Sequence, residues 1–409
     1  MTMKTKTKFS PAVTVIILFG LISLLGDAVY EGARSANSQY FNLLKVSATQ
    51  VGIVFGIGEF IGYALRLVAG IFSDKTKRYW LFIFLGYGML VAVPLMGFTM
   101  NWNILIILIL MERIGKALRN PSKDTIISAV AQNQVGVGFA FGLQEALDQI
   151  GALVGPLIFT IVFFIAESNE LTQYQLGYKA LIIPFMLLMI FLIFAYKKIE
   201  KENLIKEIHA KEYKEEKLQP TFWIYTFFTF FATLGFLNFS VIGYHLKAEG
   251  IFSDGNITLL YALAMGIDAI TALLFGKIYD NMKLKTGIKT SGLLTLLVIP
   301  FLSVALPIFT LSNSEGLVIA GMVVFGIIMG VHETIMRSAI ADIVPFYKRG
   351  TGYGVFNTAY GLALLGGSSL MGFLYDKDMT STIIILAILF EMIALLLYYK
   401  MNKMVKINN

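Results

Sequence analysis

Four polar residues in the segment LLGDAVYEGARS stand where one helix would bring their side chains together. Spacings of three, four and seven positions place them on a single helical face. They are Asp27, Tyr30, Glu31 and Arg34. Two carboxyl groups one turn apart repel each other and lose hydration on burial, and both effects favour the uptake of a proton. We therefore expect Asp27 or Glu31 to be a proton-coupling group.

Other charged and polar residues stand inside long apolar runs. An ionisable group at membrane depth is costly, so it normally faces a cavity or a partner and is a functional candidate. Arg113 is the third candidate for proton coupling. The candidates for a substrate cavity are Tyr30, Arg34, Glu112, Lys116, Glu145, Asp148, Asn238, Glu333 and Arg337.

Several of these groups also have a purely structural explanation. Glu333 and Arg337 are four positions apart and could simply pair with each other. Arg66 could pair with Glu59 or extend to the membrane surface. We expect Glu391, in the last apolar run, at the periphery of the protein.

The chain that must position these groups is too apolar for a soluble protein. Hydrophobic residues make up 57% of its 409 residues and charged residues 14%, whereas soluble domains carry about 25% charged residues. The sequence has no cysteine, which excludes disulfides, iron–sulfur clusters and thiolate zinc sites. We expect an integral membrane protein with no cofactor, no metal site and no nucleic-acid partner.

The apolar runs have the length of membrane-spanning helices. A helix needs about 20 residues to cross the hydrocarbon core, and backbone in lipid must satisfy its own hydrogen bonds. We therefore expect an all-α protein in the lipid bilayer with twelve spans: 11–33, 46–72, 80–100, 103–121, 138–165, 177–196, 221–246, 255–279, 288–311, 316–339, 351–375 and 381–400.

The distribution of basic residues predicts the orientation of these spans. With the N-terminus inside, the inner segments hold 23 of the 33 lysines and arginines and the outer segments four. Because basic residues concentrate on the cytoplasmic side, we expect both termini in the cytoplasm of a multi-pass protein.

A charged segment divides the chain into two halves. We expect an N-terminal six-helix bundle over 1–196, a cytoplasmic linker over 197–219 and a C-terminal six-helix bundle over 220–409. The halves resemble each other: GIFSD at Gly70–Asp74 corresponds to GKIYD at Gly276–Asp280. A parallel repeat of six helices is an architecture of secondary transporters.

Two local patterns resemble motifs of the major facilitator superfamily. The junction after the second span resembles its cytoplasmic loop motif, with the matching residues Gly70, Asp74, Lys75 and Arg78. In the fourth span, Leu110 and Arg113 have the spacing of the family's mid-membrane arginine motif.

The fifth predicted span resembles the glycine signature of the family's exporter branch. The matching residues are Gly142, Gly151, Gly155 and Pro156. Phe159 and Thr160 stand where two further glycines are usual. The glycines suit close helix packing and the proline suits a kink.

The resemblance implies two six-helix bundles, related by a pseudo-two-fold axis, around a cavity lined by the first, fourth, seventh and tenth spans. It implies that Asp74 helps to latch the outward-facing state. It also implies a transporter that works by alternating access and is not an enzyme. We expect proton-coupled export of a small-molecule organic substrate by a monomer in the plasma membrane.

Two other functions stay open at this point. An uptake or facilitative carrier for an organic anion would use a clamp of Arg34, Arg113, Lys116 and Arg337. A membrane-embedded enzyme or a lipid scramblase is the third possibility, although the sequence has no P-loop and no recognisable Ser/His/Asp set.

Overall fold

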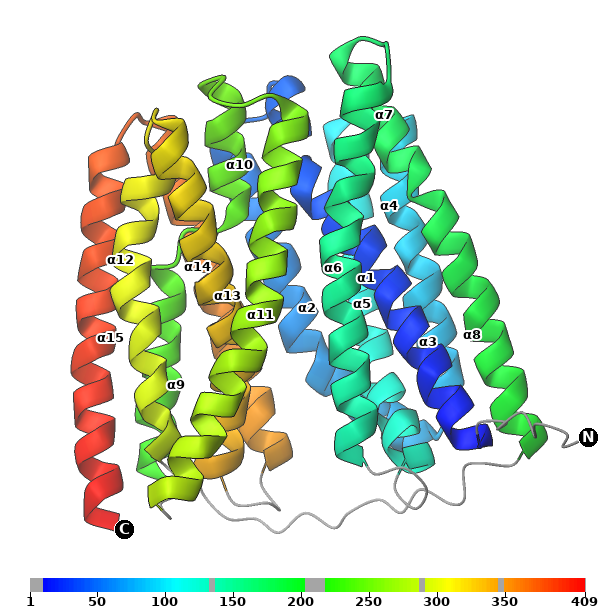
Figure 1. Cartoon of the computed structure of the whole chain (residues 1–409), viewed down its shortest axis with the longest axis vertical. Coiled ribbons are helices and arrows are strands. Elements are labelled where there is room, and N and C mark those ends of the chain that lie inside the picture. The colour runs from blue at the N-terminus through cyan, green and yellow to red at the C-terminus, as the bar shows by residue number, and fades with distance from the viewer. Residues whose placement is uncertain (1–9, 132–136, 203–217, 287–290, 345–348, 409) are drawn as a thin grey trace, which may run out of the picture.

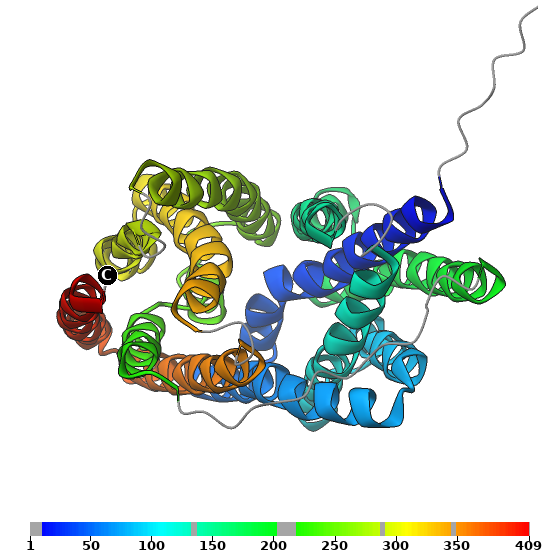
Figure 2. The ribbon, with the colours of Figure 1, turned by 90° about the horizontal axis from the view of Figure 1, so that it is seen from below.

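The computed structural model describes residues 10–131, 137–202, 218–286, 291–344 and 349–408, and these residues are almost entirely helical. No β-strand occurs in the part of the chain so described. The helices form two bundles that lie side by side, one from each half of the sequence (Figures 1 and 2). The predicted fold class, an all-α membrane protein of two helical bundles, is confirmed.

The N-terminal bundle contains eight α-helices. They are α1 (Pro11–Leu43), α2 (Ala48–Thr76), α3 (Tyr79–Gly88), α4 (Ala92–Leu95), α5 (Trp102–Ala131), α6 (Val137–Ile165), α7 (Glu170–Ala180) and α8 (Ile182–Glu202). Two short 3-10 turns, Met89–Val91 and Met96–Phe98, flank α4.

The C-terminal bundle follows the linker, of which residues 203–217 lie outside the described part. Its helices are α9 (Pro220–Leu234), α10 (Phe239–Ala248), α11 (Asp254–Thr286), α12 (Val298–Thr310), α13 (Glu315–Ile343), α14 (Arg349–Asp376) and α15 (Thr380–Asn408), with a 3-10 segment at Ser291–Leu297. Each bundle buries an apolar core of its own.

Among the described residues, ten helical segments are long and apolar enough to cross a membrane. The two other predicted spans, 103–121 and 351–375, fall within α5 and α14, which run beside the long helices (Figure 1). Their composition sets them apart: α5 carries the charged residues of a polar interior, and α14 is rich in glycine.

Several helix boundaries differ from the sequence prediction, among them the end of α5 at Ala131 rather than at 121. The first helix continues to Leu43, well past the expected end at 33, because polar residues such as Ser35 and Gln39 are fully buried against protein. The predicted span 221–246 is interrupted between Leu234 and Phe239. Asn238 caps α10, since its Oδ1 accepts a hydrogen bond from the backbone N–H of Ser240 (3.1 Å).

The two bundles meet where α2 packs against α14 and α6 packs against α11 (Figure 2). Hydrogen bonds and an ion pair join them on one face. This face lies opposite the first residues of α1 and the end of α15 (Figure 1). There Asp376, at the end of α14, accepts hydrogen bonds from the backbone N–H groups of Ala48 (2.9 Å) and Thr49 (2.7 Å). One half thus caps the first turn of α2 in the other half.

Lys247 makes a second link on the same face. Its Nζ lies 2.5 Å from Glu170 of α7 and 2.8 Å from Asp254 of α11. Tyr244 donates a hydrogen bond to the carbonyl oxygen of Val46 (2.9 Å). These contacts hold the bundles together on the face opposite the chain ends.

Asp376→Asn is expected to shift the protein toward a state that is open on this face. The substitution removes the charge that caps α2, which is worth about 1–2 kcal/mol and therefore an approximately tenfold change in population. Spin labels on Ser168→Cys and Asn313→Cys, which are exposed residues in different halves, should show a larger share of long distances.

The matched control is Asp378→Asn. Asp378 is exposed two positions further along and has a left-handed backbone (φ 55°) that asparagine adopts readily. The Asp378→Asn substitution should leave the distribution of distances between the two spin labels unchanged. Equal distributions for Asp376→Asn and the parent protein would show that the cap does not hold this face closed.

Candidate functional site

A cavity of about 460 Å³ lies between the two bundles. Helices of both halves line it, and the lining includes eight acidic and six basic side chains. The acidic residues are Asp27, Glu31, Glu59, Asp124, Glu145, Asp148, Asp268 and Glu333. The basic residues are Arg34, Arg66, Arg113, Lys116, Arg119 and Lys123. Such a lining is suited to a polar or charged ligand rather than a purely apolar one.

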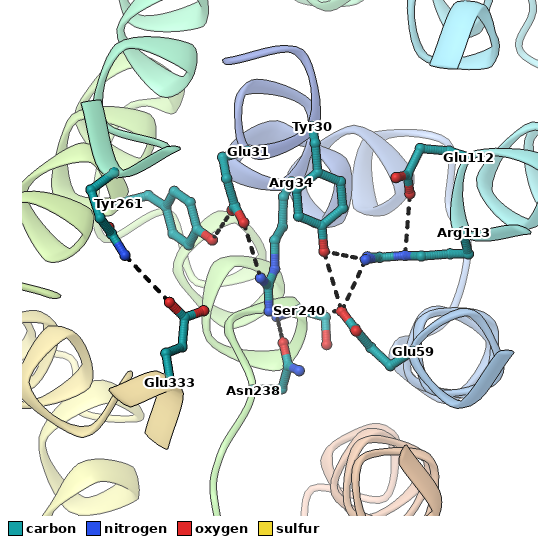
Figure 3. A network of polar contacts seen from close by, with 11 residues as sticks. Tyr30, Glu31, Arg34, Glu59, Glu112, Arg113, Asn238, Ser240, Tyr261 and Glu333 are labelled. Carbon is teal, nitrogen blue, oxygen red and sulfur yellow. Dashed lines mark hydrogen bonds and ion pairs between the residues drawn. The ribbon is translucent and has the colours of Figure 1, made fainter. Parts of the chain in front are cut away.

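A buried ion-pair network occupies the N-terminal wall (Figure 3). The Arg113 guanidinium on α5 lies 3.2 Å from Glu59 of α2 and 3.3 Å from its neighbour Glu112. Tyr30 of α1 accepts a hydrogen bond from Arg113 and donates one to Glu59. The two carboxylates therefore compensate the positive charge of Arg113. The side chains of this network are all buried: Tyr30, Glu59, Glu112 and Arg113.

Glu59 has other cationic neighbours besides the expected Arg66. It forms an ion pair with Arg113 and lies 3.9 Å from Arg34, and the charge of Arg66 also acts on it. The Arg66 guanidinium lies over the ring of Tyr63, 4.7 Å from its centroid. Glu59 and Arg66 lie on the same helix but have different neighbours, and these neighbours determine the contacts that each side chain makes.

Glu31 is engaged on both of its oxygens (Figure 3). Oε1 lies 3.4 Å from the guanidinium of Arg34, one turn further along α1. Oε2 accepts a hydrogen bond from the hydroxyl of Tyr261 on α11 (2.6 Å). Because Tyr261 belongs to the C-terminal half, this bond joins the two halves at the cavity. Tyr261 is not among the predicted site residues, since a single tyrosine in an apolar run has no distinguishing pattern.

Asp27 lies on the same helical face, about one turn before Glu31, and also lines the cavity. No carboxylate oxygen of the described residues lies within ion-pair distance of Lys116, whose Nζ is 3.8 Å from the centroid of the Tyr30 ring. Asp27 also borders the cavity, and no ion pair joins it to a described residue. Among the charged groups around them, Lys116 acts most strongly on Asp27, and Asp27 acts most strongly on Lys116.

Lys123 and Arg119 extend the polar lining along α5. The predicted span ended at 121, but α5 continues to Ala131 and buries both side chains. The Nζ of Lys123 donates a hydrogen bond to Ser23 of α1 (2.9 Å), and Arg119 donates one to the carbonyl oxygen of Gly86 (3.3 Å).

Residues of α6 and of the C-terminal half complete the lining. Glu145 and Asp148 of α6 and Asn238 at the start of α10 all border the cavity. Glu333 of α13 accepts a hydrogen bond from Gln149 of α6 (3.4 Å). Asp268 of α11 is 1% exposed, and its Oδ1 has no hydrogen-bond partner among the described residues.

Two other predicted cavity residues have different placements. Glu112 is buried behind Arg113 and does not belong to the lining of this cavity. Arg337 lies on α13, but its side chain is outside the described part of the structure.

The loop motif lies where α2 ends. Gly70, Asp74 and Lys75 belong to its last two turns, and Arg78 directly precedes α3. Asp74 accepts a hydrogen bond from Tyr79 of α3 (3.1 Å), within the same half.

The glycines of α6 allow close contact with α1. A Cβ atom at Gly151 would collide with the carbonyl oxygen of Leu24, and one at Gly155 would collide with that of Ala28. Gly142, by contrast, faces open space, and Pro156 lies inside the helix. Two members of the predicted motif therefore position the helix that carries Asp27 and Glu31.

Comparison with known proteins gives a consistent result. The model of the Major Facilitator Superfamily matches residues 12–368 and 252–405. An uncharacterised protein of Mycobacterium tuberculosis is 33% identical over 390 residues, which cover 94% of this chain and 92% of the relative. An uncharacterised MFS-type transporter of Methanocaldococcus jannaschii is 25% identical over 392 residues, 94% of each chain.

Solved structures of transporters share the fold. A bacterial homologue of the human lysosomal transporter Spinster, in an inward-facing and unoccupied conformation, has a TM-score of 0.70 at 13% identity and covers 97% of this chain and 98% of its own. A mutant of the nucleoside transporter NupG has a TM-score of 0.69 at 14% identity, covering 95% and 99%. Tetrameric PepTSo2 has a TM-score of 0.71 at 13% identity, covering 97% and 99%.

Proposed function

The chain belongs to the Major Facilitator Superfamily, and from this premise we propose that it exports a small organic solute by proton-coupled alternating access. Its family and its structural neighbours make it a membrane transporter rather than an enzyme. The observation that carries the proposal is the charged cavity between the two halves.

The orientation rests on the excess of basic residues in the segments that share a side with the N-terminus. We place both termini in the cytoplasm and the protein in the plasma membrane. The contacts of Asp376 and Lys247 then close the outer face. The described state is accordingly inward-facing, with the cavity accessible from the cytoplasm.

Proton coupling is assigned to Asp27 in preference to Glu31. Glu31 already contacts Arg34 and Tyr261, which satisfy both of its oxygens. Asp27 borders the same cavity without an ion pair to the described residues. Lys116 is the cation that acts most strongly on Asp27, but it does not form an ion pair with it, so the carboxyl group can exchange a proton as the cavity opens to one side and then the other.

Export in exchange for protons is favoured over uptake of an anion. The glycines that match the exporter signature pack α6 against α1, the helix that carries Asp27. The anion-carrier alternative needs a clamp of cations. Arg34 and Arg113, two members of that clamp, already face carboxylates within the protein, so they have little charge to offer an anion.

The test is transport into proteoliposomes across an imposed pH gradient. Radiolabelled tetraphenylphosphonium, citrate, lactose and amino acids are the probes. Antiport predicts accumulation of at least one probe when the lumen is acidic, because protons leave as solute enters. Accumulation only from an acidic bath would indicate symport, and equilibration that ignores the gradient would indicate a facilitative carrier. Either result would contradict the proposal.

A further inference from the structure

The charges that line the cavity are divided unevenly between the two halves. All six basic lining residues belong to α1, α2 and α5. Among the described side chains, the C-terminal half adds two acidic residues to the lining and no basic one: Asp268 of α11 and Glu333 of α13. The charged side chains that the structure describes on the C-terminal wall are therefore acidic.

Most of the basic residues on the opposite wall already have polar partners. Arg34 and Arg113 face Glu31 and Glu59. Lys123 donates to Ser23, and Arg119 to the backbone of α3. Lys116 differs from these, because its described contact is the face of the Tyr30 ring. Asp27 is the carboxyl group that acts most strongly on Lys116, but no ion pair joins the two among the described residues. The ammonium group of Lys116 can therefore still form a direct contact with an anionic group in the cavity.

Asp268 is the corresponding group on the acidic wall. Its side chain is 1% exposed, it borders the cavity, and its Oδ1 has no hydrogen-bond partner among the described residues. Buried carboxylate oxygens are normally satisfied, since desolvation without a partner is costly. A cationic donor on a ligand would supply the missing contact, beside Glu333.

We propose that the substrate is a zwitterion of the amino acid class, with its ammonium group at Asp268 and its carboxylate at Lys116. This inference rests on the proposed transport function and names the substrate class of that same cavity. Met265, Met329 and Phe236 line the C-terminal half of the cavity and provide apolar contact for the carbon skeleton between the two charges.

The proposed position explains how substrate binding can affect conformation. Lys116 belongs to the N-terminal half and Asp268 to the C-terminal half. A ligand that contacts both walls stabilises the state in which they lie close together. A ligand with one charge contacts one wall and cannot couple the halves in this way.

The experiment measures binding of a graded series to the purified full-length protein in detergent. The series runs from glycine to 8-aminooctanoate, so that the separation of the two charges increases by one methylene group at a time. Matched compounds with six carbons are compared with 6-aminohexanoate: hexylamine and hexanoate each carry one charge, and hexanamide carries none. Isothermal titration calorimetry gives the dissociation constants. One chain length should bind best, and matched compounds of that length should bind at least about tenfold more weakly.

Two variants assign the charges to the walls. Asp268→Asn should weaken the zwitterion about ten- to a hundredfold while leaving the matched carboxylate unchanged. Lys116→Gln should weaken the zwitterion similarly and leave the matched amine unchanged. Asp280→Asn is the control, because Asp280 is exposed on the same helix as Asp268 and outside the cavity lining. It should bind like the parent protein.

Three results would overturn the inference. The first is that no zwitterion binds at concentrations up to about 10 mM. The second is equal binding of hexanoate and 6-aminohexanoate, and the third is equal weakening of all compounds by Asp268→Asn. None of them would remove the proposed function. Accumulation of another probe in acidic-lumen proteoliposomes would still show proton-coupled export, so the two failures are distinguishable.

Discussion

Asp27→Asn is expected to abolish the accumulation of solute driven by a pH gradient. The amide has nearly the shape of the carboxyl group but cannot release a proton, so it resembles a permanently protonated acid. The cavity and its ion pairs remain, because Asp27 makes no ion pair with the described residues. Exchange of labelled for unlabelled solute without a gradient should therefore continue.

Glu31→Gln is the informative comparison. Its amide oxygen can still accept the hydrogen bond of Tyr261, but it loses the charge that faces Arg34. We expect slower transport that still responds to the gradient. Both variants are measured in the same proteoliposomes with an acidic lumen. If Asp27→Asn accumulates solute as well as the parent protein does, Asp27 is structural and the coupling group lies elsewhere.

The helices themselves could largely be predicted from the sequence. Apolar runs of the length of a bilayer locate the spans, because a backbone in lipid has few other choices. The interruption between Leu234 and Phe239 was missed, since apolar residues continue through it. The extension of α1 to Leu43 was missed for the opposite reason: its polar residues, such as Gln39, are buried by neighbouring helices.

The sequence predicts which site residues share a face of one helix, but it does not predict which residues of different helices contact each other. Helical spacing places Asp27, Glu31 and Arg34 on one face, and all three line the cavity. Spacing carries no information about which helix lies opposite, so the contacts of Glu59 with Arg113 and of Glu31 with Tyr261 were not foreseen. These contacts depend on tertiary packing over long separations in sequence.

Glu391 shows the same limit. A carboxyl group in the last span was expected at the periphery, yet Glu391 is fully buried, and its Oε1 lies close to Gly235 at the end of α9. Hydropathy describes the average environment of a run of residues. It does not show which face of a helix meets its neighbours, so the expectation for Glu391 was wrong.

Arg113→Ala is expected to destabilise the protein by about 3–5 kcal/mol and to eliminate transport. Removing one partner of a buried ion pair leaves the other charge uncompensated in a medium of low dielectric constant. Two carboxylates depend on Arg113, those of Glu59 and Glu112. Melting of the detergent-purified protein, followed by tryptophan fluorescence, measures the loss.

A double variant separates uncompensated charge from lost packing. Arg113→Ala with Glu59→Gln removes one of the two stranded carboxylates, so part of the lost stability should return. If the double variant melts no later than Arg113→Ala alone, the guanidinium acts through packing rather than charge. If Arg113→Ala melts like the parent protein, the network contributes nothing to stability.

The network should affect stability without changing the balance between conformations. Tyr30, Glu59 and Arg113 belong to α1, α2 and α5, which are all helices of the N-terminal half. In the proposed alternating-access cycle this half moves as one unit, so none of these contacts should break during the transition. Arg113→Ala should therefore leave the distance between labels at 168 and 313 unchanged, whereas Asp376→Asn lengthens it. A lengthened distance in Arg113→Ala would mean that the network also holds the two halves together.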